Sequence, residues 1–200
     1  VVIEWLGTPT PPPEGPAPLR GVRINALSTP EGLADLMALR MGLSRSNAGL
    51  DFVMLPKVES AAEVRLYAAH LCAGDRPVEL GCAIESVRGL LACHEIASAC
   101  PQVAMLGFGG GDLSTQLGAT LAWDSLLHAR SQVLQAARGA GVTALDMPFI
   151  DLENDPGLAL EAQAVRALGY RSKLAIHPRQ VPTLNRVMRP SAAELDKARR

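Results

Sequence analysis

Short apolar runs alternate with longer stretches of helical spacing along the chain, and this alternation limits the possible folds more than any other feature. Each run is continuously apolar, as expected for a strand that is buried on both faces of a sheet. Six runs recur, at Gly21–Asn25, Phe52–Lys57, Leu80–Glu85, Val103–Gly107, Thr143–Met147 and Leu174–His177. We therefore predict an α/β fold in which parallel strands are joined by right-handed helical crossovers.

The stretches between the runs have apolar residues at helical intervals and glycines where a helix would end. Ala61–Leu71 and Leu126–Arg138 carry apolar residues at helical intervals. Gly139 and Gly141 stand where the second of these helices should stop, and Gly169 stands before the last run. Glycine is usual at such helix ends. The positions of these glycines therefore predict the same alternation of strands and helices as the apolar runs.

Composition restricts the class of protein. A chain of 200 residues with 48% hydrophobic content can bury one substantial core, which favours a single domain. The formal net charge is −1 and no long Lys or Arg run occurs, so we expect no nucleic-acid partner. The sequence holds neither the roughly 20 successive apolar residues of a membrane span nor a signal-peptide pattern, so we expect no membrane partner and a cytoplasmic location.

Four cysteines, Cys72, Cys82, Cys93 and Cys100, show no C-x-x-C spacing. Free cysteine commonly serves as a small buried apolar residue. We expect structural thiols in a reducing compartment.

Charged residues stand at the downstream ends of three predicted strands. Arg23 falls in the first, Glu85 closes the third, and Asp112 follows the fourth after the glycines 109–111. If the runs are parallel strands of one barrel, their carboxyl ends point to one face, where barrel enzymes place their chemistry. We therefore predict that one cation and two carboxylates share a pocket.

Six ordered motifs resemble those of the citrate lyase β-subunit-like and malyl-coenzyme A lyase group, within the HpcH/HpaI aldolase/citrate lyase superfamily. They are Val22–Asn25 (V-R-x-N), Met54–Ser60 (L-P-K-V-E), Ile84–Gly89 (I-E-x-x-x-G), Gly109–Leu113 (a glycine-rich turn), Ala144–Asp146 (A-x-D) and Ile176–Gln180 (I-H-P-x-Q). Their order and spacing cover nearly the whole chain. The resemblance implies a TIM (β/α)8 barrel, with the six visible strands as its third to eighth.

Two parts of that barrel have no counterpart in this sequence. A closed barrel takes about 250 residues, and nothing here matches the family's first two strands or more than the start of its C-terminal lid helices. An open six-stranded sheet is the alternative, but the chain begins at Val1 rather than Met, so we expect an N-terminal truncation. The expected organisation is a helix end and proline-rich connector (1–20), the barrel (21–186) and the first part of the lid (187–200).

The resemblance implies a carbon–carbon lyase that uses Mg²⁺ to cleave malyl-, citramalyl- or citryl-CoA into acetyl-CoA and an oxo-acid. It implies Glu85 and Asp112 as metal ligands, in keeping with the preference of Mg²⁺ for carboxylate oxygens. Arg23 is expected to stabilise the developing enolate. The residues expected to bind the acyl-CoA or oxo-acid substrate are Arg23, Lys57, Gly110, Gly111, Asp112 and Asp146. Relatives form homotrimers or hexamers, so the same assembly is expected.

Each assignment has a structural alternative. Glu85 could be a solvated strand-end residue and Asp112 a helix cap. Arg23 could form a buried structural ion pair with a strand-end acid. The glycine run could bring backbone close to a ligand, supply positive φ angles, or simply form a tight turn. Asp146 could be a hydrogen-bonded polar residue in the barrel interior.

Further alternatives concern other residues and the function itself. Lys57 could form a Schiff base in a metal-free aldolase, although pairing with a nearby acid is commoner. His177 could act in acid–base chemistry or be structural. The acidic loop 151–155 could bind a second metal, although acids at a helix N-terminus are the ordinary explanation. The whole chain could also be a catalytically silent acyl-CoA-binding or regulatory module.

Overall fold

The computed structural model describes residues 18–45, 49–72 and 78–199. Of the expected helix end and proline-rich connector (1–20), only residues 18–20 lie within the described part of the chain. The described elements, in chain order, are β1 (Gly21–Arg23), α2 (Pro30–Arg45), β2 (Phe52–Leu55), α3 (Ala61–Leu71), β3 (Glu79–Ile84), α4 (Val87–Leu91), α5 (Cys93–Ala97), β4 (Val103–Phe108), α6 (Gly110–Leu117), α7 (Trp123–Ala140), β5 (Thr143–Asp146), α8 (Asp155–Leu168), β6 (Ser172–Lys173), the 3₁₀ turn η1 (Pro178–Gln180), α9 (Val181–Met188) and α10 (Ala192–Ala198).

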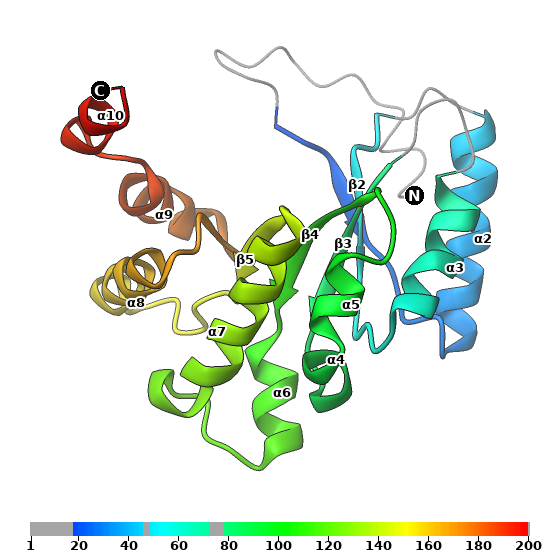
Figure 1. The fold of residues 1–200 in the computed structure, drawn as a ribbon, viewed down its shortest axis with the longest axis horizontal. Coiled ribbons are helices and arrows are strands. Elements are labelled where there is room, and N and C mark those ends of the chain that lie inside the picture. The colour runs from blue at the N-terminus through cyan, green and yellow to red at the C-terminus, as the bar shows by residue number, and fades with distance from the viewer. Residues whose placement is uncertain (1–17, 46–48, 73–77, 200) are drawn as a thin grey trace.

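The strands form one parallel sheet whose spatial order, β1 to β6, is also their order in the chain. Because this order never reverses, right-handed crossovers place successive helices on the same face of the sheet. Figure 1 shows the helices in an arc around the curled strands. The α/β prediction is confirmed, in the form of a six-stranded half-barrel.

The sixth strand was expected at Leu174–His177, and this prediction is wrong. The strand is Ser172–Lys173, and the ladder continues only as far as the Leu174 N–H, which donates to the Asp146 carbonyl at 2.9 Å. Pro178 then begins a 3₁₀ turn. A search for apolar runs misses this strand because its buried residue is Lys173, whose ammonium is neutralised by acids from other elements.

The apolar core lies between the sheet and the helices. Val53, Leu80 and Leu106 are completely buried strand residues, and burial of each such side chain contributes about 1.5–3 kcal/mol. Helix α3 is an example of how the helices pack against these strand residues. Its residues Ala61, Val64, Tyr67 and Leu71 form one buried face, and the Ser60 side chain caps its start by accepting from the Glu63 N–H.

Glycines end two of the long helices, as expected. Gly141 (φ 73°) follows α7 and Gly169 (φ 124°) follows α8, and both adopt positive φ angles that favour glycine. Gly139, expected to mark the same helix end, instead lies within α7, whose last residue is Ala140.

The four cysteines are free thiols. Burial raises the pKa of the Cys82 thiol to about 12, so this group stays protonated at neutral pH and packs as an apolar side chain. Within the described segments, no helix is both long enough and apolar enough to span a lipid bilayer.

We expect opposite stability effects from alanine at two helical glycines. A Cβ on Gly89 in α4 would lie 2.4 Å from the Val58 carbonyl oxygen, whereas one on Gly139 in α7 would meet no atom within 4 Å. Gly89→Ala should therefore lower the free energy of unfolding by about 1–3 kcal/mol. Gly139→Ala should raise it by about 0.5–1 kcal/mol. Urea unfolding followed by circular dichroism measures both, and equal effects would contradict the close approach of α4 to Val58.

Candidate active site

Four charged residues stand where successive strands end. Arg23 ends β1, Lys57 follows β2, Glu85 follows β3, and Asp112 lies in the first turn of α6, directly after β4. Arg23, Glu85 and Asp112 line one cleft of about 640 Å³, and an adjoining hollow of about 420 Å³ is lined by all four. The structure thus brings the predicted cation and the two predicted carboxylates to one place.

Glu85 is the most enclosed of these residues, with only 12% of its side chain exposed. Its Oε1 accepts a hydrogen bond from the backbone N–H of Lys57 at 2.7 Å and lies 3.7 Å from Nη2 of Arg23. An ion pair with a strand-end acid, which is part of the alternative for Arg23, is therefore present, but on the Arg23 side it is not buried. This pair lies inside the cleft, and 64% of the Arg23 side chain remains exposed.

Lys57 has a left-handed backbone, with φ at 50°, unlike every other non-glycine residue that the structure describes. This conformation costs about 1–2 kcal/mol for a residue with a Cβ. It directs the Lys57 N–H to Glu85, while Nζ lies 3.6 Å from Oδ2 of Asp112. Both side chains of this second ion pair are more than half exposed. The motif suggested a role for the Lys57 side chain, but nothing in it indicated the contact made by the backbone N–H.

The three successive glycines differ in how much space surrounds them. A Cβ on Gly109 would lie 2.3 Å from the Cβ of Glu85, and one on Gly110 would lie 2.5 Å from the Met147 sulfur. Gly111 has no atom within 4 Å of such a Cβ, so it faces open space. None of the three adopts a positive φ angle, so that expected role is wrong. Gly109 and Gly110 make room for the protein's own side chains, and close approach to a ligand stays a prediction.

The expected alternative for Asp112, a helix cap, is wrong. The N-cap position of α6 is Gly109, and no side chain caps this helix. Asp112 lies instead in the first turn, where a carboxylate is favoured by the helix dipole. The first N–H groups of a helix have no partner within it, and at α6 they belong to Gly110 and Gly111, which line the cleft, and to Asp112 itself.

The loop after Arg23 is held by contacts that sequence reasoning did not find. Oδ2 of Asp35 accepts from both the backbone N–H and the side-chain amide of Asn25, each at 2.9 Å. The Tyr67 hydroxyl accepts from the N–H of Leu27. Burial raises the pKa of Tyr67 to about 12, so the hydroxyl remains neutral. Asn25 was part of the V-R-x-N motif, but its partners on other elements could not be read from it.

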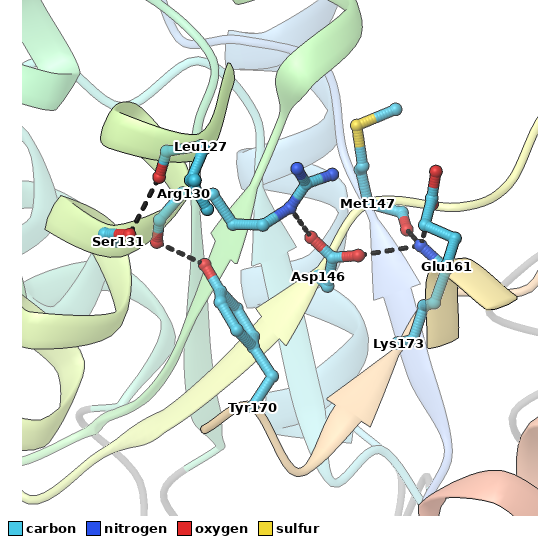
Figure 2. A network of polar contacts seen from close by, with 8 residues as sticks. All are labelled: Leu127, Arg130, Ser131, Asp146, Met147, Glu161, Tyr170 and Lys173. Atoms are coloured by element: carbon cyan, nitrogen blue, oxygen red, sulfur yellow. Dashed lines mark hydrogen bonds and ion pairs between the residues drawn. The ribbon is translucent and has the colours of Figure 1, made fainter. Parts of the chain in front are cut away.

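Asp146 lies apart from these groups. It is fully buried, and its two carboxylate oxygens each bind a cation, Oδ1 the Nε of Arg130 and Oδ2 the Nζ of Lys173, both at 2.7 Å (Figure 2). Asp146 is not among the residues that line the cleft. Its surroundings are those of the alternative, a hydrogen-bonded polar residue in the interior.

The remaining candidates also have structural partners. Nδ1 of His177 accepts from the N–H of Arg179, and His177 does not line the cleft. In the acidic loop, the Asn154 side chain caps α8 and Asp155 begins that helix, which agrees with the ordinary explanation for acids there. Within residues 18–45, 49–72 and 78–199, no group of three or more His, Cys, Asp or Glu side chains could hold a metal ion.

Comparisons with known proteins agree with the motifs. The sequence model of the HpcH/HpaI aldolase/citrate lyase family matches residues 16–178. The citrate lyase subunit beta of Escherichia coli is 35% identical over 188 residues, which cover 90% of this chain and 60% of that protein. The L-malyl-CoA/beta-methylmalyl-CoA lyase of Cereibacter sphaeroides is 32% identical over 203 residues, covering 89% and 63%.

A solved structure supports the fold assignment. CitE of Mycobacterium tuberculosis, in complex with magnesium, acetoacetate and coenzyme A, superposes with a TM-score of 0.70 at 34% identity and covers 90% of this chain and 64% of that one. The present chain therefore spans about three fifths of the length of its matched relatives. With the family match extending over most of its residues, the chain belongs to the HpcH/HpaI aldolase/citrate lyase family.

Proposed function

We propose that the chain forms most of a TIM (β/α)8 barrel in a Mg²⁺-dependent carbon–carbon lyase. Its substrate would be a 3-hydroxyacyl-CoA of the malyl, citramalyl or citryl type, cleaved into acetyl-CoA and an oxo-acid. The observation that carries this proposal is the convergence of Arg23, Glu85 and Asp112, from three separate strand ends, on one cleft. The names of the relatives support a lyase, and their similar identities to this chain leave the choice among these substrates open.

The donor set fits magnesium. Glu85 and Asp112 offer hard carboxylate oxygens, and Mg²⁺ typically takes one or two carboxylates and leaves its other positions to water and substrate. When bound, the ion would supply Lewis-acid stabilisation of negative charge on substrate oxygens. CitE of M. tuberculosis, a relative with the same architecture, binds magnesium in its crystal structure.

Arg23 is suited to stabilise the anion that cleavage produces. Breaking the carbon–carbon bond leaves an enolate on the acetyl-thioester fragment, and a guanidinium remains charged at any working pH. The Arg23 side chain is 64% exposed, so its donors can reach a ligand in the cleft, while Glu85 holds it at the β1 end. Its role is therefore electrostatic.

The start of α6 is suited to bind the carboxylate of the oxo-acid. Its N–H groups have no partner within the helix, and a helix N-terminus favours an anion. Gly111 adds no side chain to this part of the cleft wall. The ammonium group of Lys57, near Asp112, adds a second positive charge on the same side. Asp146 has no place in this binding scheme, because both of its oxygens are engaged by cations in the interior.

The surroundings of Lys57 argue against the Schiff-base alternative. Imine chemistry needs a neutral amine, which an apolar pocket or a neighbouring cation favours. The Lys57 side chain is 54% exposed and its Nζ lies beside a carboxylate. A silent acyl-CoA-binding module stays as the second candidate, because the chain spans about three fifths of its relatives. Assembly as a trimer or hexamer is likewise a prediction from the family.

We expect removal of either proposed ligand to abolish most of the activity. Glu85→Gln and Asp112→Asn should each lower kcat/KM by about 100-fold or more, because each removes an anionic ligand of the ion that would stabilise the negative charge of the transition state. The measurement follows acetyl-CoA release by full-length protein from malyl-, citramalyl- and citryl-CoA with Mg²⁺, and calorimetry gives the Mg²⁺ affinity. Asp124→Asn, an exposed acid in the first turn of α7, is the matched control and should behave as wild type.

Three outcomes of this assay would count against parts of the proposal. Activity that survives EDTA would exclude the metal-dependent mechanism. Tight substrate binding by the wild type without product would favour the silent module. Full activity in Glu85→Gln or Asp112→Asn would remove that residue from the catalytic set.

Alanine at Gly111 tests the carboxylate site. Its methyl group would enter the open space at the start of α6, so Gly111→Ala should raise the KM for the substrate by about tenfold. Its melting temperature should not fall, because no atom lies within 4 Å and alanine suits a helix. Gly139→Ala is the control for glycine removal away from the cleft. An unchanged KM in Gly111→Ala would mean that the substrate does not approach this turn.

A further inference from the structure

A buried charge network behind the cleft has no part in the proposed chemistry, although its residues belong to four separate elements. Arg130 of α7 and Lys173 of β6 bind opposite oxygens of Asp146, and Nζ of Lys173 also binds Oε1 of Glu161 in α8 at 2.6 Å. Figure 2 shows the Asp146 carboxylate between the two cations. Arg130, Asp146 and the Lys173 side chain are each at most 2% exposed.

Stability alone is a poor explanation for this network. Buried ion pairs can often be replaced by apolar side chains without loss of stability, because their desolvation offsets their attraction. Here Nη1 of Arg130 is also buried without a hydrogen-bond partner in the described part of the chain, and an unsatisfied buried donor is itself destabilising. Such charge-assisted contacts are short and directional. They therefore hold the groups that they contact in fixed positions.

One set of contacts runs from Arg130 to the glycine-rich turn. The Arg130 guanidinium carbon lies 5.0 Å from the ring centre of Phe108 and 4.6 Å from that of Trp123. Phe108 is the last residue of β4 and directly precedes Gly109. Its ring also comes within 2.9 Å of the Cβ position of Gly110. The guanidinium therefore fixes the ring that borders the turn.

A second set reaches the same glycine from Lys173. Its Nζ donates to the Met147 carbonyl at 2.7 Å, and so fixes the chain directly after Asp146. The Met147 sulfur then lies 2.5 Å from the Cβ position of Gly110. Gly110 starts α6 and is followed by Gly111 and Asp112. Both arms of the network thus meet at the residue that sets where Asp112 stands.

We propose that Arg130 and Lys173 are positioning residues, which hold Phe108 and Met147 against Gly110 and thereby place Asp112 and the first N–H groups of α6 in the cleft. The proposal deepens the proposed function, on which its ligand-binding consequences rest. Neither residue touches a ligand, since neither lines the cleft. Their effect passes through the turn.

The test compares Arg130→Met with Tyr170→Phe in the full-length protein. Arg130→Met replaces the arginine with a long, unbranched apolar side chain and so removes the guanidinium and its charge. Tyr170→Phe removes the hydrogen bond from the Tyr170 hydroxyl to the Arg130 carbonyl and leaves the guanidinium in place, so it controls for a general loss of stability. The first readout is hydrogen–deuterium exchange of metal-free protein over residues 107–113. The second is Mg²⁺ affinity by calorimetry.

We expect Arg130→Met to exchange at least about tenfold faster in residues 107–113, with little change in α3. Its Mg²⁺ affinity should fall by about 10- to 100-fold, as for the loss of groups that orient metal ligands. Tyr170→Phe should melt at a lower temperature but keep slow exchange in the turn and wild-type affinity. Lys173→Met should reproduce the effect of Arg130→Met through Met147. If Arg130→Met does not fold, Arg130→Lys takes its place, since it keeps the charge but not the planar group over both rings.

Unchanged exchange in the turn of Arg130→Met would overturn the proposal, and so would a rise spread evenly over the protein or matched by Tyr170→Phe. If wild-type protein binds no Mg²⁺ but Arg130→Met still loosens residues 107–113 selectively, the proposed function fails and the positioning role stands. Slow exchange together with weakened Mg²⁺ binding would also overturn it, because the effect would then not pass through the turn.

Discussion

The parallel, unreversed order of the six strands determines where the charged residues at the strand ends come together. Neighbouring strands run about 4.8 Å apart, and all of them end on the same side, so charged residues at successive strand ends come within reach of one another. The two ion pairs of the cleft both join alternate strands, Arg23 with Glu85 across β1 and β3, and Lys57 with Asp112 across β2 and β4. Barrel interiors are layered in this alternating way.

Much of this arrangement could be predicted from the sequence, for a physical reason. Strands buried on both faces are continuously apolar, so the first five were found to within two residues of their observed ends. The sixth was misplaced because its buried residue is a charged one, Lys173, which only its tertiary partners make possible. Likewise, the left-handed backbone of Lys57 depends on a contact with Glu85, 28 residues away, that no local pattern specifies.

Asp112 and Asp146 show the same limit for side chains. Both acids stand near the ends of strands, and both were expected to meet the substrate. The Asp112 side chain is 58% exposed in the cleft, whereas Asp146 is enclosed by Arg130 and Lys173, which lie 16 and 27 residues away in the chain. Strand position indicated which residues to consider. Whether a carboxylate faces solvent or a buried cation was decided by helices and strands elsewhere in the sequence.

The pairing of Glu85 and Asp112 with Arg23 and Lys57 has a further consequence for how ions enter the cleft. The hollow beside the cleft is lined by all four, and with two negative and two positive side chains this pocket is close to electroneutral before any ligand arrives. A divalent cation entering by itself would give the pocket an excess of two positive charges. The same cation accompanied by a doubly charged organic acid would leave the pocket neutral. The electrostatics therefore favour joint entry of the cation and the acid. Rising ionic strength should weaken that preference only for the charged side chains that are open to solvent.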